Sequence, residues 1–310
     1  MAPGYRGPAM GLIEARRLLH VCYCCSEVEA AAGFFGAGCG FAAKMRTTGR
    51  NDGVQLDVPG TMDSDVIFMF DRRGARSSPA IEVQGWIVPP AEGSPYAEPS
   101  NIGLQALGLA VPDLAAAGDR LGQAGAVKVG EADEAVFGAK AAIWRDPSGA
   151  LIDVLEDAGV EGATRFAHLR MTCADLGPCL DWYQQLGFAL VESPRVVRAE
   201  MGSLRGRLEV CVLQLPDEPT RLLLIRWIQP ASTGTSYDRA NHRGWYRLAI
   251  AVDDTQQAYQ SLSAAGWNFT DPPRLTQLSG TPVPDMWIAF TRDPNNIPVE
   301  LVQRPRSAFR

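Results

Sequence analysis

The chain has 310 residues, of which 46% are hydrophobic and 21% charged, so it can bury two ordinary hydrophobic cores. No apolar run approaches the roughly 20 residues of a membrane-spanning helix, and the first residues lack the apolar core of a signal peptide, so we expect a cytoplasmic protein. A net charge of -6 without a cluster of lysines and arginines argues against nucleic acid or an anionic membrane as partner and favours a small molecule.

Four strand-to-helix segments follow one another along the chain. The first apolar strand opens at His20, and the next three are expected at residues 104–111, from His168, and at 246–252. An acidic residue that can cap the helix stands at each junction: Glu27, Asp113, Asp175 and Asp254. Short apolar segments follow each helix and are typical of about three strands. The sequence therefore predicts an α+β protein made of four βαβββ modules.

The modules form two homologous halves. Three blocks recur in the same order at a nearly constant offset: the strands at His20 and His168, the segments around Trp86 and Trp227, and two Asp-Pro turns at residues 146 and 293. We expect a flexible segment at residues 1–15, followed by two domains. The N-terminal domain covers 16–158 (modules 16–92 and 101–158), and the C-terminal domain covers 164–305 (modules 164–232 and 243–305).

This fourfold pattern resembles the vicinal oxygen chelate superfamily, which includes glyoxalase I, methylmalonyl-CoA epimerase, extradiol dioxygenases, and the bleomycin and fosfomycin resistance proteins. The resemblance covers residues 16–303. It implies that two modules pair into a curved, partly open barrel around a cleft, so that four modules make two clefts. It also implies metal ligands at the first residue of a module's first strand and at an acidic residue on its last strand.

In the N-terminal half, the ligand positions that the resemblance implies fall on His20, Glu82 and Asp153, with Ala106 in the fourth position. One imidazole and two carboxylates suit Zn²⁺, Fe²⁺, Mn²⁺ or Ni²⁺, and Ala106 would leave room for water or substrate. Glu82 or Asp153 could then leave the metal and act as a base. Alternatively, His20 makes only internal hydrogen bonds, and Asp153 faces solvent.

In the C-terminal half, the same positions fall on His168, Glu300, Leu223 and Arg247. A guanidinium in a ligand position repels a divalent cation, so no metal is expected there. Arg170 shares the face of His168, because residues two apart on a strand point the same way. Arg170 and Arg247 could clamp a carboxylate or phosphate, unless Glu300 neutralises one of them in an ion pair.

The same periodicity places further side chains in the N-terminal cleft. Cys22 lies beside His20, while Gln84 and Trp86 lie beside Glu82. Trp86 would suit a planar or apolar ligand, although a hydrophobic wall is the simpler interpretation. The residues expected to contact substrate are Cys22, Gln84, Trp86, His168, Arg170, Arg247 and Glu300.

Three functions follow. The favoured hypothesis is a divalent-metal-dependent lyase or isomerase, which acts on a small carbonyl-containing molecule through an enolate-type intermediate in the N-terminal cleft. The alternative is a metal-free protein of the drug-sequestering or resistance kind. An extradiol-type dioxygenase is disfavoured, because the family places two histidines and a carboxylate in the C-terminal domain, where Arg247 replaces one histidine. We expect an anionic or aromatic ligand and a monomer or homodimer.

Overall fold

The computed structural model describes residues 11–304, so residues 1–10 of the expected flexible segment lie outside the described part. The four predicted modules are present in chain order. The first consists of β1 (Arg17–Cys25), α1 (Val28–Ala37), β2 (Ala42–Asn51), the short 3₁₀ helix η1 (Val54–Leu56), β3 (Met62–Phe70) and β4 (Ala80–Val88). The second consists of β5 (Gly103–Val111), α2 (Leu114–Gln123), β6 (Val127–Ala132), α3 (Glu134–Phe137), β7 (Ala141–Arg145) and β8 (Leu151–Glu156).

The second repeat has the same plan. The third module consists of β9 (Arg165–Thr172), α4 (Leu176–Gln185), β10 (Ala189–Met201), β11 (Leu204–Gln214) and β12 (Arg221–Gln229). The fourth consists of β13 (Gly244–Val252), α5 (Thr255–Ala264), β14 (Arg274–Thr276), β15 (Met286–Arg292) and β16 (Pro298–Gln303). The predicted fold class is thereby confirmed. No helix within residues 11–304 is long and apolar enough to cross a membrane.

The predicted helix caps form at three of the four junctions. The carboxylates of Asp113, Asp175 and Asp254 accept hydrogen bonds from backbone N–H groups in the first turns of α2, α4 and α5. These bonds satisfy donors that have no partner within the helix. Glu27 precedes α1 without such a side-chain bond, so the capping prediction is wrong at this position.

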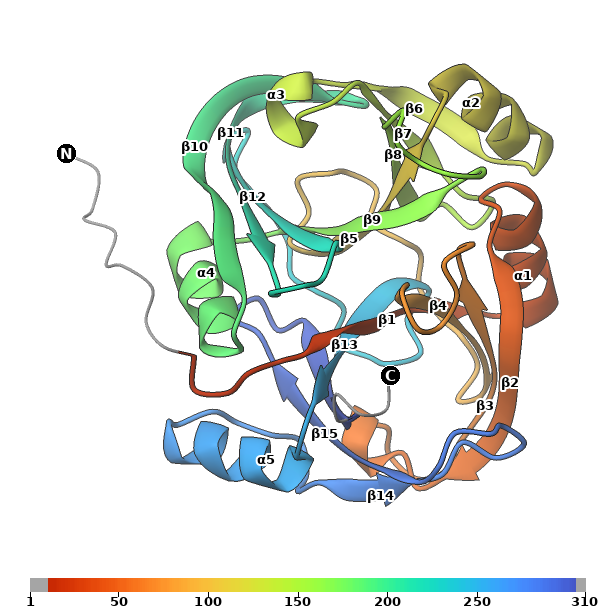
Figure 1. Ribbon diagram of the computed structural model, residues 1–310, viewed down its shortest axis with the longest axis vertical. Coiled ribbons are helices and arrows are strands. Elements are labelled where there is room, and N and C mark those ends of the chain that lie inside the picture. Colours follow the sequence, from red (N-terminus) through yellow and green to blue (C-terminus); the bar gives the residue numbers. More distant parts are fainter. Residues whose placement is uncertain (1–10, 305–310) are drawn as a thin grey trace.

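The modules pair across the two repeats (Figure 1). An eight-stranded sheet in the order β14-β15-β16-β13-β1-β4-β3-β2, called here the open sheet, joins the first and fourth modules. The second and third modules form a closed barrel in the order β10-β11-β12-β9-β5-β8-β7-β6. The expectation that each half holds its own cleft is therefore wrong. Strand β1 has a second edge to pair, and β13 occupies it in antiparallel fashion.

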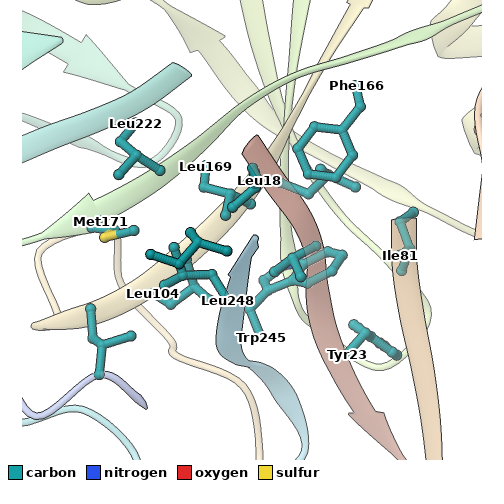
Figure 2. Close-up of a cluster of buried hydrophobic side chains, with 14 of the residues drawn as sticks. Leu18, Tyr23, Ile81, Leu104, Phe166, Leu169, Met171, Leu222, Trp245 and Leu248 are labelled. Atoms are coloured by element: carbon teal, nitrogen blue, oxygen red, sulfur yellow. The ribbon is translucent and has the colours of Figure 1, made fainter. Parts of the chain in front are cut away.

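The main core lies between the two sheets (Figure 2). Leu18 and Leu248, from the open sheet, and Leu104 and Leu169, from the barrel, belong to one cluster and are at most 2% exposed. Each of these strands thus buries one face in the shared core. Its other face lies on the inner side of the open sheet or of the barrel to which the strand belongs. The inward faces carry the residues that were predicted to form sites.

The closed barrel and the open sheet differ at their edges. Strand β10 has 13 residues and reaches β6, where Met201 pairs with Ala132 and closes the barrel. The corresponding strand β14 has only 3 residues. Pro272 and Pro273 precede it, and prolines also punctuate the segment that follows; proline cannot donate to a strand ladder. The open sheet therefore keeps a gap between β14 and β2.

The two Asp-Pro turns form tight connections within hairpins, as predicted. Asp293 joins β15 to β16, and its carboxylate accepts hydrogen bonds from the backbone of Asn295 and Ile297 and from the Tyr183 hydroxyl. Burial raises the pKa of Asp293 to about 6, although these hydrogen bonds oppose the rise. A folded-state pKa above the unfolded value makes protonation stabilising, and this stability is lost as the pH rises through 6.

We expect the substitution Asp293→Asn to remove this pH dependence. From pH 4 to pH 7, the unfolding free energy of the unmutated protein should fall relative to that of the variant by about 2–3 kcal/mol. Urea unfolding of both proteins across this range checks the prediction, because the other titrating groups cancel in the difference. Parallel curves for the two proteins would contradict it.

Candidate functional site

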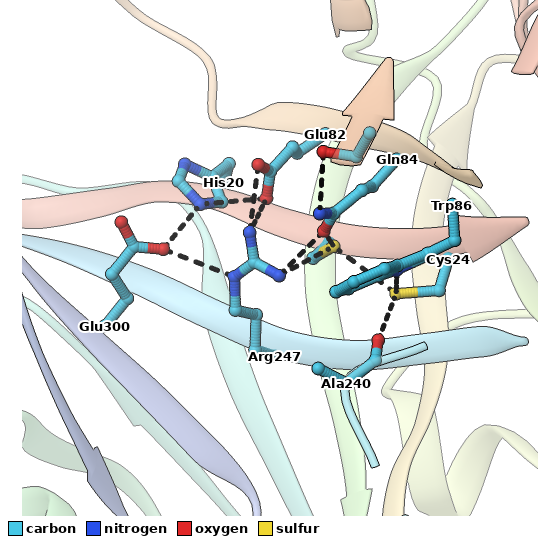
Figure 3. Close-up of polar contacts among 10 residues, drawn as sticks. His20, Cys24, Glu82, Gln84, Trp86, Ala240, Arg247 and Glu300 are labelled. Atoms are coloured by element: carbon cyan, nitrogen blue, oxygen red, sulfur yellow. Dashed lines mark hydrogen bonds and ion pairs between the residues drawn. The ribbon is translucent and has the colours of Figure 1, made fainter. Parts of the chain in front are cut away.

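Four charged or titratable side chains from four strands meet on the inner face of the open sheet (Figure 3). They are His20 on β1, Glu82 on β4, Arg247 on β13 and Glu300 on β16. The Nε2 atom of His20 lies 3.3 Å from Oε2 of Glu82 and 3.3 Å from Oε2 of Glu300. Each of these residues occupies a ligand position that the resemblance implied, so the predicted strand registers hold.

The guanidinium of Arg247 lies between the two carboxylates. Its Nη2 donates to both oxygens of Glu82 at 2.9 and 2.8 Å, and its Nε donates to Oε2 of Glu300 at 3.3 Å. Its Nη1 contacts Oε1 of Gln84 at 3.0 Å and Sγ of Cys22 at 3.2 Å. Every nitrogen of this guanidinium is thus used inside the protein, which leaves it unable to clamp an anionic ligand.

Burial and charge act in opposite directions on this cluster. Burial would raise the pKa of Glu300, but the neighbouring His20 and Arg247 lower it below the usual value, so this carboxylate is ionised at neutral pH. Burial likewise opposes the charge of Arg247, yet Cys22, Glu82 and Glu300 together raise its pKa well above the usual value. The cluster is therefore a buried ion-pair network with a permanent cation at its centre.

Trp86 and the neighbouring thiols of Cys22 and Cys24 pack together in one hydrophobic cluster of the open sheet. The indole N–H of Trp86 donates to Sγ of Cys24 at 3.3 Å, and Cys24 donates to the carbonyl of Ala240 at 3.2 Å. Trp86 is 3% exposed and packs in a cluster with Cys22 and Cys24. These contacts fit core packing, the simpler of the two interpretations of Trp86.

An apolar cavity of about 340 Å³ opens beside the charged cluster. His20, Glu82 and Glu300 form its acidic, polar end, and Arg17, Ser78 and Arg304 also belong to its lining. The ring of His20 meets Phe68 edge-on. The apolar lining includes Leu19, Met45, Phe68, Phe70, Leu278, Val283, Met286 and Ile288. A second, more polar hollow of about 550 Å³ shares Glu82 and Glu300 and extends toward Arg50 and Arg274.

The sequence reasoning missed the apolar walls of this cavity. Strand periodicity puts Val66, Phe68 and Phe70 on one face of β3. The intervening Ile67 and Met69 are equally apolar, so the sequence did not indicate which face lines the cavity. Leu278 and Val283 lie in the segment 277–285 between β14 and β15, where no periodic pattern exists. Only the tertiary structure brings that segment over the cavity.

Asp153, the third predicted metal ligand, lies in the closed barrel. There its Oδ2 accepts from Nε of Arg170 at 2.8 Å and lies 3.1 Å from Nε2 of His168, and its Oδ1 accepts from Nη2 of Arg170 at 2.9 Å. Burial would raise the pKa of Asp153, but Arg170 and His168 more than offset this effect and lower it. The predicted set of His20, Glu82 and Asp153 is therefore wrong, because two of its members belong to one sheet and the third to the other.

The predicted C-terminal set is likewise divided between the two sheets. His168 and Leu223 belong to the barrel, whereas Arg247 and Glu300 belong to the open sheet. Neither Arg170 nor Arg247 is free to bind an anion, since both are held in ion pairs with carboxylates. The alternative left open by the sequence, in which Glu300 neutralises one of the two arginines, describes Arg247. The partner of Arg170 is instead Asp153, which the sequence reasoning had not placed there.

The barrel has a cavity of its own at its mouth. This cavity has a volume of about 680 Å³, and His168 and Phe137 lie together in its wall. Gly108 lies directly under the ring of His168, where a Cβ atom would come within 2.1 Å of the imidazole. Leu223, at the ligand position of β12, lines the same cavity and packs with apolar side chains inside the barrel, including Val210 and Ile225.

The residues of the open-sheet cluster do not fit the divalent metal that the resemblance implies. An ion centred among His20, Glu82 and Glu300 would lie beside the guanidinium of Arg247, which is already paired with both carboxylates and repels a second cation. Within residues 11–304, no group of three or more His, Cys, Asp or Glu side chains is placed to hold a metal ion. Ala106 provides no ligand in the barrel either.

Comparison with known proteins places the chain in a family. The model of the Glyoxalase/Bleomycin resistance protein/Dioxygenase superfamily matches residues 17–154 and again 165–301. No curated protein matches the chain.

Two solved structures share the fold. Glyoxalase I from Zea mays is 16% identical, with 92% of each chain covered and a TM-score of 0.65. A putative dioxygenase from Bacillus subtilis is 12% identical, with 96% of this chain and 87% of that chain covered and a TM-score of 0.66. Because the two stretches matched by the family model together span most of its length, the chain belongs to the glyoxalase/bleomycin resistance protein/dioxygenase superfamily.

Proposed function

We propose that the open-sheet cleft binds an apolar small molecule without a metal ion, so that the protein works as a ligand-sequestering member of its superfamily. The observation that carries this proposal is the position of Arg247. Its guanidinium occupies a ligand position and makes ion pairs with Glu82 and Glu300, the carboxylates that would otherwise bind the metal. This arrangement argues against a metal-dependent lyase or isomerase and against an extradiol dioxygenase.

The cavity supports an apolar ligand of modest size. Its volume of about 340 Å³ is more than twice that of an apolar cavity of about 150 Å³ that holds a benzene molecule. Phe68 and Phe70 provide flat aromatic surface, and Met45 and Met286 provide adaptable apolar contacts. A ring with a short aliphatic extension fits this space.

The polar end of the cavity favours a hydrogen-bond donor on the ligand. Oε2 of Glu300 and Nε2 of His20 contact each other, whereas the other oxygen of Glu300 and Nδ1 of His20 have no hydrogen-bond partner among residues 11–304 (Figure 3). The free carboxylate oxygen of Glu300 can only accept hydrogen bonds. A ligand hydroxyl or amino group can therefore donate to this oxygen, whereas a ligand carboxylate would meet the charge of Glu300 at this end of the cavity.

A binding measurement tests this proposal with 4-butylphenol as the probe. Isothermal titration should give one site, with a Kd that stays the same after treatment of the protein with EDTA. Leu19 lies at the partly exposed wall of the cavity, so Leu19→Trp should fill the space and weaken binding about tenfold or more.

Leu12→Trp provides the matched control, since Leu12 is 41% exposed and does not line the cavity. It should leave the Kd unchanged. Binding that disappears with EDTA and returns with added Zn²⁺ would refute the metal-free proposal. Equal affinity in the Leu19 variant would refute the location of the site.

A further inference from the structure

We infer that Leu278 divides the ligand site into two compartments and determines the length of ligand that the apolar compartment accepts. This inference rests on the proposed function, because it concerns the same cleft. Leu278 lines both the apolar cavity of about 340 Å³ and the polar hollow of about 550 Å³. Its side chain thus stands at the boundary between them.

Leu278 contacts two hydrophobic clusters of the open sheet, one from the fourth module and one from the first. On one side it packs against the cluster of the fourth module, which includes Met286 and Ile288. On the other side it packs against the cluster of the first module, which includes Phe68 and Phe70. It therefore spans the gap that the short strand β14 leaves in the sheet.

The segment that carries Leu278 is attached to the body of the protein mainly through side chains. Segment 277–285 crosses the cleft between β14 and β15, and we call it the strap. In the described part of the chain, its hydrogen bonds are internal: Thr281 donates to the carbonyl of Leu278 through its N–H and its hydroxyl, and Val283 donates to the Thr281 hydroxyl. Leu278 and Val283 are its apolar anchors in the clusters below.

This arrangement gives the apolar compartment a defined depth. We expect a ligand with its donor group at Glu300 and its apolar body along Phe68 to reach Leu278, which packs against the cluster that includes Phe68 and Phe70. Truncation of Leu278 to alanine would join the compartments, because Glu82, Glu300, Thr276 and Ile288 already line both. The strap can tolerate this change, since Leu278 is only partly buried.

A homologous series measures the depth of the compartment. We propose titration of the unmutated protein and Leu278→Ala with 4-alkylphenols whose chains run from methyl to octyl. While the chain still enters apolar space, each methylene should tighten binding about fourfold. In the unmutated protein this gain should stop at an intermediate chain length, and in Leu278→Ala it should continue for roughly two more methylenes. Leu278→Phe should make it stop earlier.

Leu275→Ala is the matched control, because Leu275 is on the adjacent strand β14, is 56% exposed, and lines only the polar hollow. It should leave the limiting chain length where it is. If the limiting chain length is the same in the unmutated protein and in both Leu278 variants, the role of Leu278 is overturned but the proposed function is not. No binding of any alkylphenol to the unmutated protein would overturn the proposed function, and this inference with it.

Discussion

Arg247→His should convert the open-sheet cluster into a metal site. The substitution removes the guanidinium and brings a second imidazole to His20, Glu82 and Glu300, which completes four N and O ligands suited to Zn²⁺ or Ni²⁺. After dialysis against Zn²⁺, we expect about one equivalent in the variant and less than about 0.1 in the unmutated protein. Elemental analysis measures both contents.

A stability measurement separates a specific site from adventitious metal. Loss of the ion pairs should destabilise the variant without metal, and Zn²⁺ should restore its Tm, because a ligand that binds only the folded state stabilises it. Arg247→Met is the matched control, since it removes the same charge and supplies no ligand. About one equivalent of Zn²⁺ in the unmutated protein would contradict the proposal of a metal-free cleft. A folded but metal-free histidine variant would show that these positions do not converge on an ion.

Asp153→Ala should destabilise the protein by about 3–5 kcal/mol at pH 7. Asp153 is 0% exposed and is the carboxylate that both Arg170 and His168 contact. Its loss leaves the guanidinium of Arg170 buried without a counter-ion, and Nη1 of Arg170 already has no partner among the described residues. Urea unfolding measures the effect, and Asp153→Asn, which keeps the shape, provides a milder variant.

Asp157→Ala is the control for Asp153→Ala, because Asp157 also pairs with an arginine, Arg165, but at 40% side-chain exposure. It should cost at most about 1 kcal/mol. The pKa of Asp153 is lowered in the folded protein, so its contribution is present at neutral pH and is lost as the pH falls through that pKa. The gap between the unmutated protein and Asp153→Ala should therefore narrow in acid. Equal costs for the two alanine variants would contradict the buried ion-pair account.

The Asp153 variants also test where the site lies. If Asp153→Asn leaves the affinity for 4-butylphenol unchanged, the barrel triad and the open-sheet cleft are independent, as their membership of different sheets implies. A tenfold loss of affinity in a folded Asp153→Asn protein would instead indicate that the barrel takes part in binding.

Much of the local structure could be predicted from the sequence. Residues two apart on a strand share a face, which places Cys22 beside His20 and Gln84 beside Glu82. In the structure, all four side chains contact Arg247 or one of its partners. The Asp-Pro turns and three of the four helix caps are also short-range features. Such patterns depend only on backbone geometry within a few residues, which the chain specifies locally.

The pairing of modules was decided only by the tertiary structure. Strand β1 offers one free edge, and the apolar strands β5 and β13 resemble each other closely enough that no local signal distinguishes them as its partner. The choice depends on the summed packing of many distant residues across the core between the sheets. It separated Asp153 from His20 and Glu82, and it placed Glu300 and Arg247 beside them.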